Sequence, residues 1–370
     1  MLSIKKLPVW EGTYTEPNKG ICKEFNLILN EKINIFQQFN ICKTFYENND
    51  YKFITKPPGS GEYSNKRGNR IIEIILNYTK NLKPKNILEI GAGSDYIVQG
   101  IDKKLNFENA TLIDPSLKIP NNKKIKIINE YYPYSNINKE EFDLIYSINV
   151  LEHVNNPRDL LINVRNNLRD NGYIIFIFPD VENRIKIGDV GCLLHEHINY
   201  FTKNSAISFF EGCGFEIIDL YSNEENGEIH VFCKKNTKNY HQNKGPNKFK
   251  EFEELSKDVS LMIKKLNRNK EKFLDYYSKG MKVGFHGACN ALSNFLYLCD
   301  LNHLEDFYIF DGDKLKTHTY LPFSDKRILH CSNSLYKEID ILFVAATNFS
   351  KEITLEASKS IAKNKIFDLY

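Results

Sequence analysis

The stretch Asn86-Ile87-Leu88-Glu89-Ile90-Gly91-Ala92-Gly93 decides the fold of this chain. Its apolar part, residues 87–90, is typical of a buried parallel strand, which is apolar along most of its length. The strand passes directly into a turn with two glycines, and glycine accepts positive φ angles and lets a ligand approach the backbone closely. A strand that breaks on glycines and enters a helix forms a ligand cradle at the carboxyl edge of a sheet. We therefore expect a cofactor to bind there.

The residues after the glycine turn alternate between helix and strand patterns. We expect a helix over residues 94–105, a strand over residues 110–116 and a weaker strand over residues 124–129. The second strand contains Asp114, about 20 residues beyond the glycines, which is the spacing at which a carboxylate reaches a ribose. A carboxylate can accept hydrogen bonds from both ribose hydroxyls, so the residue type suits that role.

The second half of the pattern keeps the same rhythm. Pro157 favours the start of a helix, and Asn226-Gly227 favours a tight hairpin turn. The expected elements are a strand over residues 141–149, a helix over 157–169, a turn at 170–172, a strand over 173–178, and a hairpin formed by 215–222 and 228–234. Strands and helices that alternate in this way predict an α/β fold with a doubly wound parallel sheet.

This ordered series of motifs resembles that of class I S-adenosylmethionine-dependent methyltransferases. The matching stretches are Glu89 to Gly93, Asp114 to Ser116, Asn149 to Val154 and Leu168 to Tyr173. The resemblance implies that S-adenosylmethionine is the cofactor, with the glycine turn against its methionine part and Asp114 on its ribose. The cofactor-binding residues that it implies are Glu89, Gly91, Ala92, Gly93, Asp114, Pro115, Asn149, Val150 and His153.

A NAD-binding protein is the alternative for such a glycine turn. NAD sites commonly have a third glycine, in the pattern G-x-G-x-x-G, where the helix packs closely. Here Gly93 is followed by Ser94-Asp95-Tyr96, so the bulky Tyr96 stands at the position of that glycine. The sequence therefore favours a methyltransferase over a dehydrogenase.

Length and charge exclude several other classes of protein. With 370 residues, two domains are expected, and 50 Lys and Arg against 47 Asp and Glu leave a net charge of only +3, which does not favour nucleic acid as a partner. The 8 cysteines are scattered without a C-x-x-C pair, which is typical of a reduced compartment. No apolar run reaches the roughly 18 residues of a membrane span, and no signal peptide is visible. We expect a cytoplasmic protein with a small-molecule substrate and no membrane partner; its oligomeric state stays open.

The chain divides into four expected segments. These are an N-terminal segment (residues 1–69), the cofactor-binding domain (70–235), a linker and long helix (236–280), and a second, smaller α/β domain of Rossmann-like pattern (281–370). The last segment begins with a strand and turn, Val283-Gly284-Phe285-His286-Gly287-Ala288. Such a unit either serves structure alone or forms a wall of the substrate cleft.

The segment most suited to chemistry is Leu194-His195-Glu196-His197-Ile198-Asn199-Tyr200. It follows the fifth strand, on the side of the sheet where ligands bind in such folds. Histidine moves protons near neutral pH, and a neighbouring carboxylate can raise its basicity. No metal site is expected, because H-x-H lacks a third and fourth ligand and the H-E-x-x-H spacing is absent. The alternative is that the two histidines only form hydrogen bonds within a turn and have a structural role.

Together with the core and the C-terminal unit, this segment resembles the sugar C-methyltransferase family, which methylates keto-sugars carried on a nucleoside diphosphate, a step of carbohydrate biosynthesis. The resemblance implies that His197 is the base that removes the proton beside the ketone, with Glu196 and His195 orienting it or the sugar. It also places Tyr63, in Gly61-Glu62-Tyr63-Ser64, beside the site. The substrate contacts that it implies are Tyr200, His286, Asn290 and Asn348.

The chain departs from that family in two places. Leu194 stands where the family has a tyrosine, so a phenol that could hold an enolate oxygen is missing. Only Cys22 and Cys42 lie in the region where the family has a zinc module, so a four-thiolate site cannot form there. An O- or N-methyltransferase acting on another sugar or surface-glycan precursor is therefore the alternative function. A scaffold without activity is disfavoured, because it has no use for an acid at the ribose position.

Overall fold

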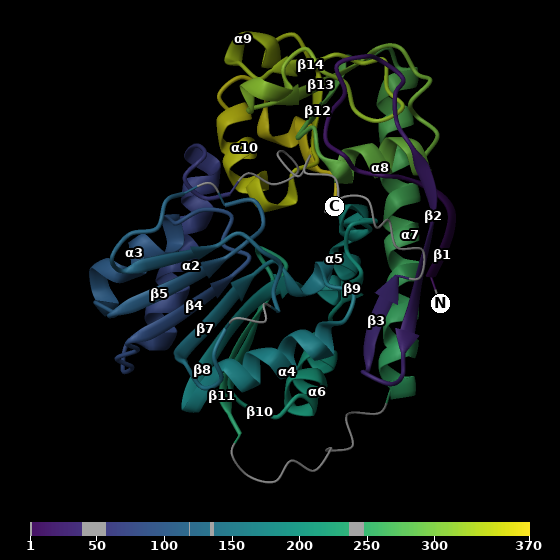
Figure 1. Ribbon diagram of the computed structural model, residues 1–370. Coiled ribbons are helices and arrows are strands. Elements are labelled where there is room, and N and C mark those ends of the chain that lie inside the picture. Colours follow the sequence, from purple (N-terminus) through teal and green to yellow (C-terminus); the bar gives the residue numbers. More distant parts are fainter. Residues whose placement is uncertain (1, 39–56, 118, 134–136, 237–247) are drawn as a thin grey trace.

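The computed structural model describes residues 2–38, 57–117, 119–133, 137–236 and 248–370. Within this part of the chain there are sheets of seven, five and four strands (Figure 1). The expected linker, residues 236–246, lies almost wholly outside the described residues. No helix among the described residues is long and apolar enough to cross a membrane.

The seven-stranded sheet is the expected doubly wound α/β sheet. Its strands are β4 (Asn86–Ile90), β5 (Asn109–Ile113), β6 (Ile125–Ile128), β7 (Phe142–Ile148), β8 (Leu168–Pro179), β10 (Phe215–Asn223) and β11 (Glu228–Lys235). Their order is β10-β11-β8-β7-β4-β5-β6. The five strands from β8 to β6 are parallel to their neighbours, whereas β11 is antiparallel to β8 and to β10. The strand order reverses beside β4, which is where such sheets bind ligands.

Helices cover both faces of this sheet because the side chains of each strand alternate between two cores. Ile87 packs with α2 (Glu62–Thr79) and α3 (Tyr96–Leu105) on one face. Leu88 packs with α4 (Pro157–Asn167) and α6 (Lys203–Gly212) on the other. Ile87 and Leu88 are both fully buried although they point to opposite faces, which explains the continuous apolar run in the sequence.

Two local expectations are corrected. The sequence pattern indicates a helix over residues 70–80, but helix α2 already begins at Glu62. The turn expected at residues 170–172 is an irregularity inside β8, because Leu168 pairs with Phe142 and Tyr173 with Leu144, so extra residues bulge from the strand. Asn171 has a φ of 63°, a left-handed conformation that asparagine adopts more readily than most residues.

The C-terminal sheet is parallel throughout, with the order β14-β13-β12-β15-β16. Its strands are β12 (Val283–His286), β13 (Phe307–Asp311), β14 (Ile328–His330), β15 (Ile341–Val344) and β16 (Ile366–Asp368), and its helices are α8 (Asn290–Leu298), α9 (Asn333–Tyr336) and α10 (Ser350–Ala357). The long helix α7 (Lys248–Ser278) contributes Phe273, whose ring contacts Phe285, Phe307 and Phe343. The sequence pattern indicates four of these strands, at residues 282–288, 306–311, 339–345 and 365–369, and a helix at residues 290–298, whereas β14, α9 and α10 were not predicted.

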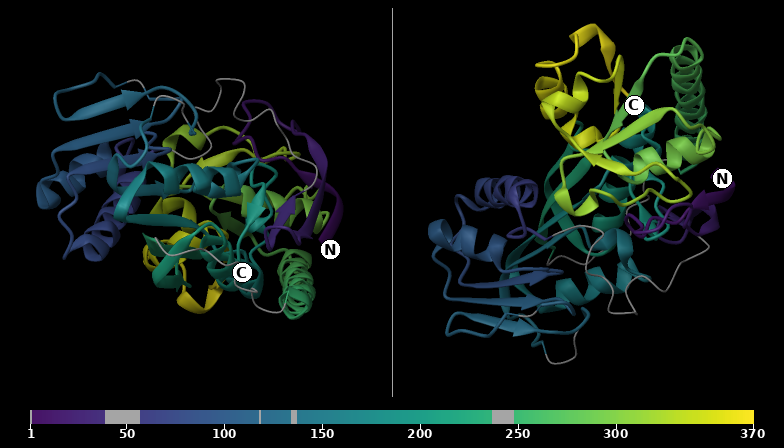
Figure 2. Two further views of the ribbon diagram at one scale, coloured as in Figure 1. Left: turned by 60° about the horizontal axis from the view of Figure 1, so that its bottom comes forward. Right: turned by 90° about the horizontal axis from the view of Figure 1, so that it is seen from above.

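The N-terminal sheet was not predicted. It contains β1 (Leu2–Pro8), β2 (Cys22–Asn30), β3 (Ile35–Gln38) and, from far along the chain, β9 (Asn199–Tyr200). Strands β3 and β9 pair antiparallel through Phe36 and Tyr200. In Figures 1 and 2 the N-terminal strands lie beside α7, and residues from both share one core with the C-terminal sheet. The N-terminal sheet therefore supports the segment that carries the histidines.

Short helices complete the connections between the sheets. They are α5 (Val181–Ile187) and the 3₁₀ turns η1 (Leu151–His153), η2 (Val190–Cys192), η3 (Lys314–Lys316), η4 (Thr347–Phe349) and η5 (Lys363–Lys365). Of these, α5, η1, η2 and η4 bring residues to the cleft described next.

Candidate active site

A cleft of about 1550 Å³ opens at the carboxyl ends of β4, β5 and β7 and is bounded on its far side by the start of α8 and by η4. It is therefore shared between the seven-stranded sheet and the C-terminal unit. The predicted site residues that line it are Glu89, Gly91, Ala92, Gly93, Asp114, Pro115, Asn149, Val150, His153, Glu196, His197, Tyr200, Asn290 and Asn348.

The glycine turn forms the floor of the cleft at backbone level. Gly91 has a φ of 73° and Gly93 a φ of 60°. A Cβ atom built on Gly91 would lie 2.2 Å from Cγ2 of Val150, so no side chain fits there. The Gly91 amide donates to the carbonyl of Ile113 at 2.8 Å, which holds the turn against the end of β5. This is a fixed cradle into which an elongated polar ligand can be placed against bare backbone.

Asp114 is held at the end of β5 by hydrogen bonds to both carboxylate oxygens. Its Oδ2 accepts from the Gly93 amide at 3.1 Å, and its Oδ1 accepts from the amide and hydroxyl of Ser116 at 2.7 and 2.6 Å. The side chain is half-buried at the wall of the cleft. Among the described residues, Oδ2 accepts only the hydrogen bond from the Gly93 amide and retains acceptor capacity, so this carboxylate fits the ribose of the expected cofactor.

Glu89 lies behind the glycine turn in a buried position. The Tyr146 hydroxyl donates to its Oε2 at 2.6 Å. Burial raises the pKa of the Glu89 carboxyl to about 8, because the hydrogen bond from Tyr146 only partly offsets the loss of water and the charges of Asp114 and Asp95 oppose ionisation. Glu89 therefore reaches the cleft mainly as a neutral group at and below neutral pH.

The histidine segment is positioned by Asn199. Its Nδ2 donates to the carbonyls of Leu151 and Val154 at 2.8 and 2.7 Å, and its Oδ1 accepts from Nε2 of Gln37 at 2.7 Å. The amide of Ile198 also donates to the carbonyl of Glu152 at 2.7 Å. These bonds join the histidine segment, η1 and β3 into one rigid wall.

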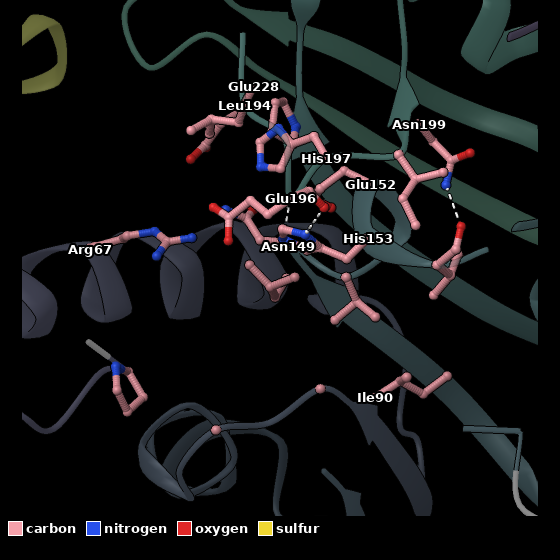
Figure 3. A pocket seen from close by; sticks show the side chains of 18 of the residues that line it. Arg67, Ile90, Asn149, Glu152, His153, Leu194, Glu196, His197, Asn199 and Glu228 are labelled. Atoms are coloured by element: carbon pink, nitrogen blue, oxygen red, sulfur yellow. Dashed lines mark hydrogen bonds and ion pairs between the residues drawn. The ribbon is translucent and has the colours of Figure 1, made fainter. Parts of the chain in front are cut away.

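Three side chains meet on that wall (Figure 3). The imidazoles of His153 and His197 pack edge to face with ring centroids 4.8 Å apart. Nδ1 of His153 lies 3.0 Å from the backbone carbonyl of Glu196, and its Nε2 lies 3.8 Å from Oε1 of Glu152. Glu152 stands in the quoted motif after the fourth strand, but its place beside His197 was not predicted, because only the fold brings the two residues together.

Burial dominates the ionisation of this wall. It lowers the pKa of His153 to about 4 and holds the pKa of His197 well below its usual range, with the neighbouring imidazole adding to the effect. It raises the pKa of the Glu196 carboxyl to about 7 and that of Glu152 to about 8. Both imidazoles are therefore neutral at pH 7, and each can offer a lone pair.

Two of the predicted residues are not brought to the cleft. His195 is buried with its ring against Phe25, at a centroid distance of 5.7 Å, because a turn closed by the His197 amide and the Leu194 carbonyl separates the two histidines. His286 is buried in the C-terminal sheet, where Nδ1 contacts the Tyr336 hydroxyl and burial lowers its pKa to about 4. Neither residue lines the cleft. The side chain of Tyr63 lies outside the described residues.

Tyr200 lines the cleft, but its hydroxyl is already engaged. It donates to the carbonyl of Leu194 at 2.7 Å and accepts from the Leu194 amide at 3.2 Å. Its ring lies 6.0 Å from that of His197. Tyr200 therefore shapes the turn that presents Glu196 and His197, and it does not replace the phenol missing at Leu194.

The C-terminal wall is joined to the sheet domain through Arg184, which the sequence did not single out. This side chain contacts the carbonyl of Asn226 and Oδ1 of Asn348, and its Nη1 lies 3.3 Å from Oδ2 of Asp189. The Thr347 hydroxyl donates to the same Asp189 oxygen at 3.0 Å. The Asn348 position is thus set by a network that crosses the cleft.

A second cationic feature comes from α2. Arg70 forms a bidentate pair with Glu228 at 2.8 and 2.9 Å, and Arg67, one turn earlier, lines the cleft. Burial alone would raise the pKa of Glu228, but hydrogen bonds from His230 and Arg70 and the charges of Arg70 and Arg67 hold it at about 2. Glu228 therefore stays ionised and fixes this side of the cleft.

Comparison with known proteins gives one family match and distant relatives. Residues 63–220 match the family model described as a methyltransferase domain. The C-methyltransferase NovU of Streptomyces niveus is 23% identical over 237 residues, which cover 60% of this chain and 55% of NovU. The chain thus spans about half the length of this curated relative.

Solved structures with a similar fold are more distant still. The 1,6-didemethyltoxoflavin-N1-methyltransferase of Burkholderia thailandensis is 12% identical to this chain, with a TM-score of 0.38. The aligned part covers 47% of this chain and 80% of the Burkholderia chain. Human N-acetylserotonin methyltransferase in complex with SAM is 13% identical, also with a TM-score of 0.38. The aligned part covers 46% of this chain and 55% of the human chain. The strand order described above is stronger evidence of the fold than either likeness.

Proposed function

We propose that this chain, which contains a class I S-adenosylmethionine-dependent methyltransferase domain, methylates a carbon atom of a keto-sugar linked to a nucleotide. One observation carries the proposal: a single cleft is lined both by the glycine turn with Asp114 and by Glu196 with His197. A methyl acceptor placed between them would lie between the cofactor cradle and groups that can take a proton. The name of the relative NovU, a C-methyltransferase, supports the same chemistry.

The residues present fit the cofactor. The glycine turn lines the cleft with bare backbone and would hold its methionine part, and Asp114 would accept hydrogen bonds from its ribose. When bound, S-adenosylmethionine supplies an electrophilic methyl group. The chain contributes alignment, since holding two reactants in line is an orientation effect worth several kcal/mol.

Methylation at carbon needs removal of a proton beside the ketone. Glu196 and His197 lie next to each other on the wall of the cleft, and each can accept that proton while the electrons of the C–H bond form an enolate on the sugar. The sequence resemblance favours His197 for this role. The neutral state of its imidazole is compatible with it.

The far wall suits a polar substrate. Asn290 and Asn348 line it, and Arg67 and Arg184 place guanidinium groups in the same cleft. Guanidinium groups bind phosphate oxygens in a forked geometry, so a sugar that carries a diphosphate fits this chemistry. Asp189 bonds Arg184, and Glu228 bonds Arg70 and lies within the electrostatic reach of Arg67, so carboxylates in the same cleft favour the recognition of hydroxyls as well.

One observation favours a second candidate. Leu194 lines the cleft where a phenol would be needed to hold the enolate oxygen, so transfer to oxygen or nitrogen of another sugar or surface-glycan precursor is the alternative. Such a reaction needs a base but no enolate.

The experiment is incubation of the chain in D₂O with a nucleotide-linked 4-keto-6-deoxy sugar, with and without S-adenosylmethionine, followed by NMR. We expect exchange of the proton beside the ketone without cofactor, and a new methyl group with it. Cofactor binding without exchange or transfer would contradict carbon methylation and favour the oxygen or nitrogen alternative.

A further inference from the structure

Glu152, His153 and His197 form a cluster whose geometry goes beyond a proton acceptor. One ligand atom from each side chain lies within 4.8 Å of the others, and no other such group of three is present among the described residues. The sequence alone offered only His195 and His197 as a pair of histidines. In the structure His195 points into the core, and Glu152 and His153 of η1 lie beside His197 instead.

The buried state of Glu152 is the first independent observation. Its side chain is 1% exposed, and neither carboxylate oxygen has a hydrogen-bond partner among the described residues. A buried carboxylate without partners is costly, whereas one that coordinates a cation is compensated. The carboxylate faces the two imidazoles on the wall of the cleft (Figure 3).

The hydrogen bond of His153 is the second observation. Its Nδ1 lies 3.0 Å from the carbonyl of Glu196, so Nδ1 carries the proton and donates, and the lone pair is on Nε2 on the Glu152 side. Metal-binding histidines commonly donate their second ring N–H to a backbone carbonyl in this way, which fixes the tautomer and the ring orientation. The bonds from Asn199 and Ile198 lock the two loops that carry the cluster.

We propose that Glu152, His153 and His197 bind one divalent transition-metal ion of the zinc type at the wall of the cleft. Two imidazoles and one carboxylate are the ligand set of catalytic zinc sites, which keep a further position for water or substrate. The binding site stands on its own geometry, but its use rests on the function proposed above. There the ion would supply positive charge beside the ketone oxygen, where Leu194 offers no hydroxyl.

The site also divides the roles of the neighbouring residues. A His197 lone pair that binds the ion cannot take a proton, so the C–H proton would pass to the carboxylate of Glu196, which becomes a carboxylic acid while the C–H electrons form the enolate. His197 would then act as a ligand and Glu196 as the proton acceptor.

The test is binding of Co²⁺ to the metal-stripped full chain, followed by visible absorption and equilibrium dialysis, without cofactor or substrate. We expect one Co²⁺ per chain with the absorption bands of a low-coordinate site. Glu152→Gln and His197→Gln should each weaken binding more than about 100-fold, because even loss of a hydrogen-bonding partner of a ligand costs about 10- to 100-fold. Two matched controls are Glu89→Gln, which removes a second buried carboxyl, and His303→Gln, which removes an exposed imidazole. Both should bind Co²⁺ with the affinity of the wild type.

No Co²⁺ binding by the wild type, or unchanged affinity in either Glu152→Gln or His197→Gln, would overturn the proposal. Circular dichroism checks that both variants fold, and if one does not, the other decides. Calorimetric binding of S-adenosylmethionine is measured on the same samples. Failure of cofactor binding would count against the proposed function and would leave the metal result as it stands.

Discussion

A methyl group added at Gly91 would have no space, which makes this one residue a sensitive probe of the cradle. The added Cβ would lie 2.2 Å from Val150, and the φ of 73° is unfavourable for any L-residue with a side chain. We expect Gly91→Ala to weaken binding of S-adenosylmethionine more than about 10-fold, which corresponds to about 1.4 kcal/mol. Calorimetry checks this, with Gly61→Ala as control because nothing lies within 4 Å of its Cβ position. Equal affinities in the two variants would contradict the cradle.

Asp114 and His197 should separate cofactor binding from turnover. Loss of a carboxylate that accepts hydrogen bonds costs about 1.5–3 kcal/mol, so Asp114→Ala should weaken cofactor binding by about 10- to 100-fold. His197→Ala should leave cofactor affinity unchanged and slow methyl transfer, because its ring packs against His153 and not on the glycine turn. Equal loss of cofactor affinity in both variants would refute this division.

Glu89 gives a pH dependence of stability whose sign follows from its environment. Its pKa is about 8 in the folded chain against an ordinary value of 4.5, so the folded state holds a proton that the unfolded state releases. The stability that this group contributes is full below about pH 4.5 and is lost as the pH rises through about 8. Between about pH 5 and about pH 8, the free energy of unfolding should fall more for the wild type than for Glu89→Gln. Urea denaturation measures it, with the exposed Glu73→Gln as control; parallel curves for Glu89→Gln and the wild type would be the contrary result.

At the scale of elements, the strands and helices that the sequence predicted are those with local patterns. Strand β4 is apolar on both faces, and α8 was predicted with its observed bounds, Asn290–Leu298, because each signal lies within the element. The N-terminal sheet could not be predicted in the same way. Its strand β1 is mostly exposed or half-buried, and its partner β9 has only two residues and comes from far along the chain.

The candidate site followed the same division. The glycine turn and Asp114 are set by one strand–turn–helix unit and one following strand, so spacing alone predicted them. His195 was placed beside His197 by sequence, but a turn and the ring of Phe25, which belongs to β2, take it into the core. Glu152 and Arg184 gain their importance only from contacts with distant segments, which no local pattern records.

Asn199 joins the histidine segment to η1 and β3, so its substitution tests how much this connection contributes. It is 1% exposed, and its side chain donates to the carbonyls of Leu151 and Val154 and accepts from the side-chain Nε2 of Gln37. Asn199→Ala leaves those groups unpaired, so we expect a loss of about 2–3 kcal/mol in unfolding free energy. We also expect slower methyl transfer, with cofactor affinity nearly unchanged. Asn163→Ala, which removes one exposed local bond, is the control; equal stability of the two variants would contradict the proposed joint.

For the whole molecule, the important feature is that one cleft is shared by two α/β units. Arg184 contacts Asn226 of the sheet domain, Asn348 of the C-terminal unit and Asp189 between them. We expect Arg184→Met to raise the KM for the proposed sugar substrate more than about 10-fold while the cofactor Kd stays unchanged. Arg165→Met, which removes bonds to two backbone carbonyls away from the cleft, serves as control. A rise in the cofactor Kd with an unchanged KM for the substrate would contradict a role of Arg184 in substrate binding.

The most direct test of the account is the position of the transferred methyl group. The full chain is incubated with a nucleotide-linked 4-keto-6-deoxy sugar and S-adenosylmethionine labelled with ¹³C in its methyl group, and the product is read by two-dimensional NMR. The account predicts a labelled methyl bonded to the ring carbon beside the ketone. A label on oxygen or nitrogen, or no transfer from a cofactor that binds, would contradict it.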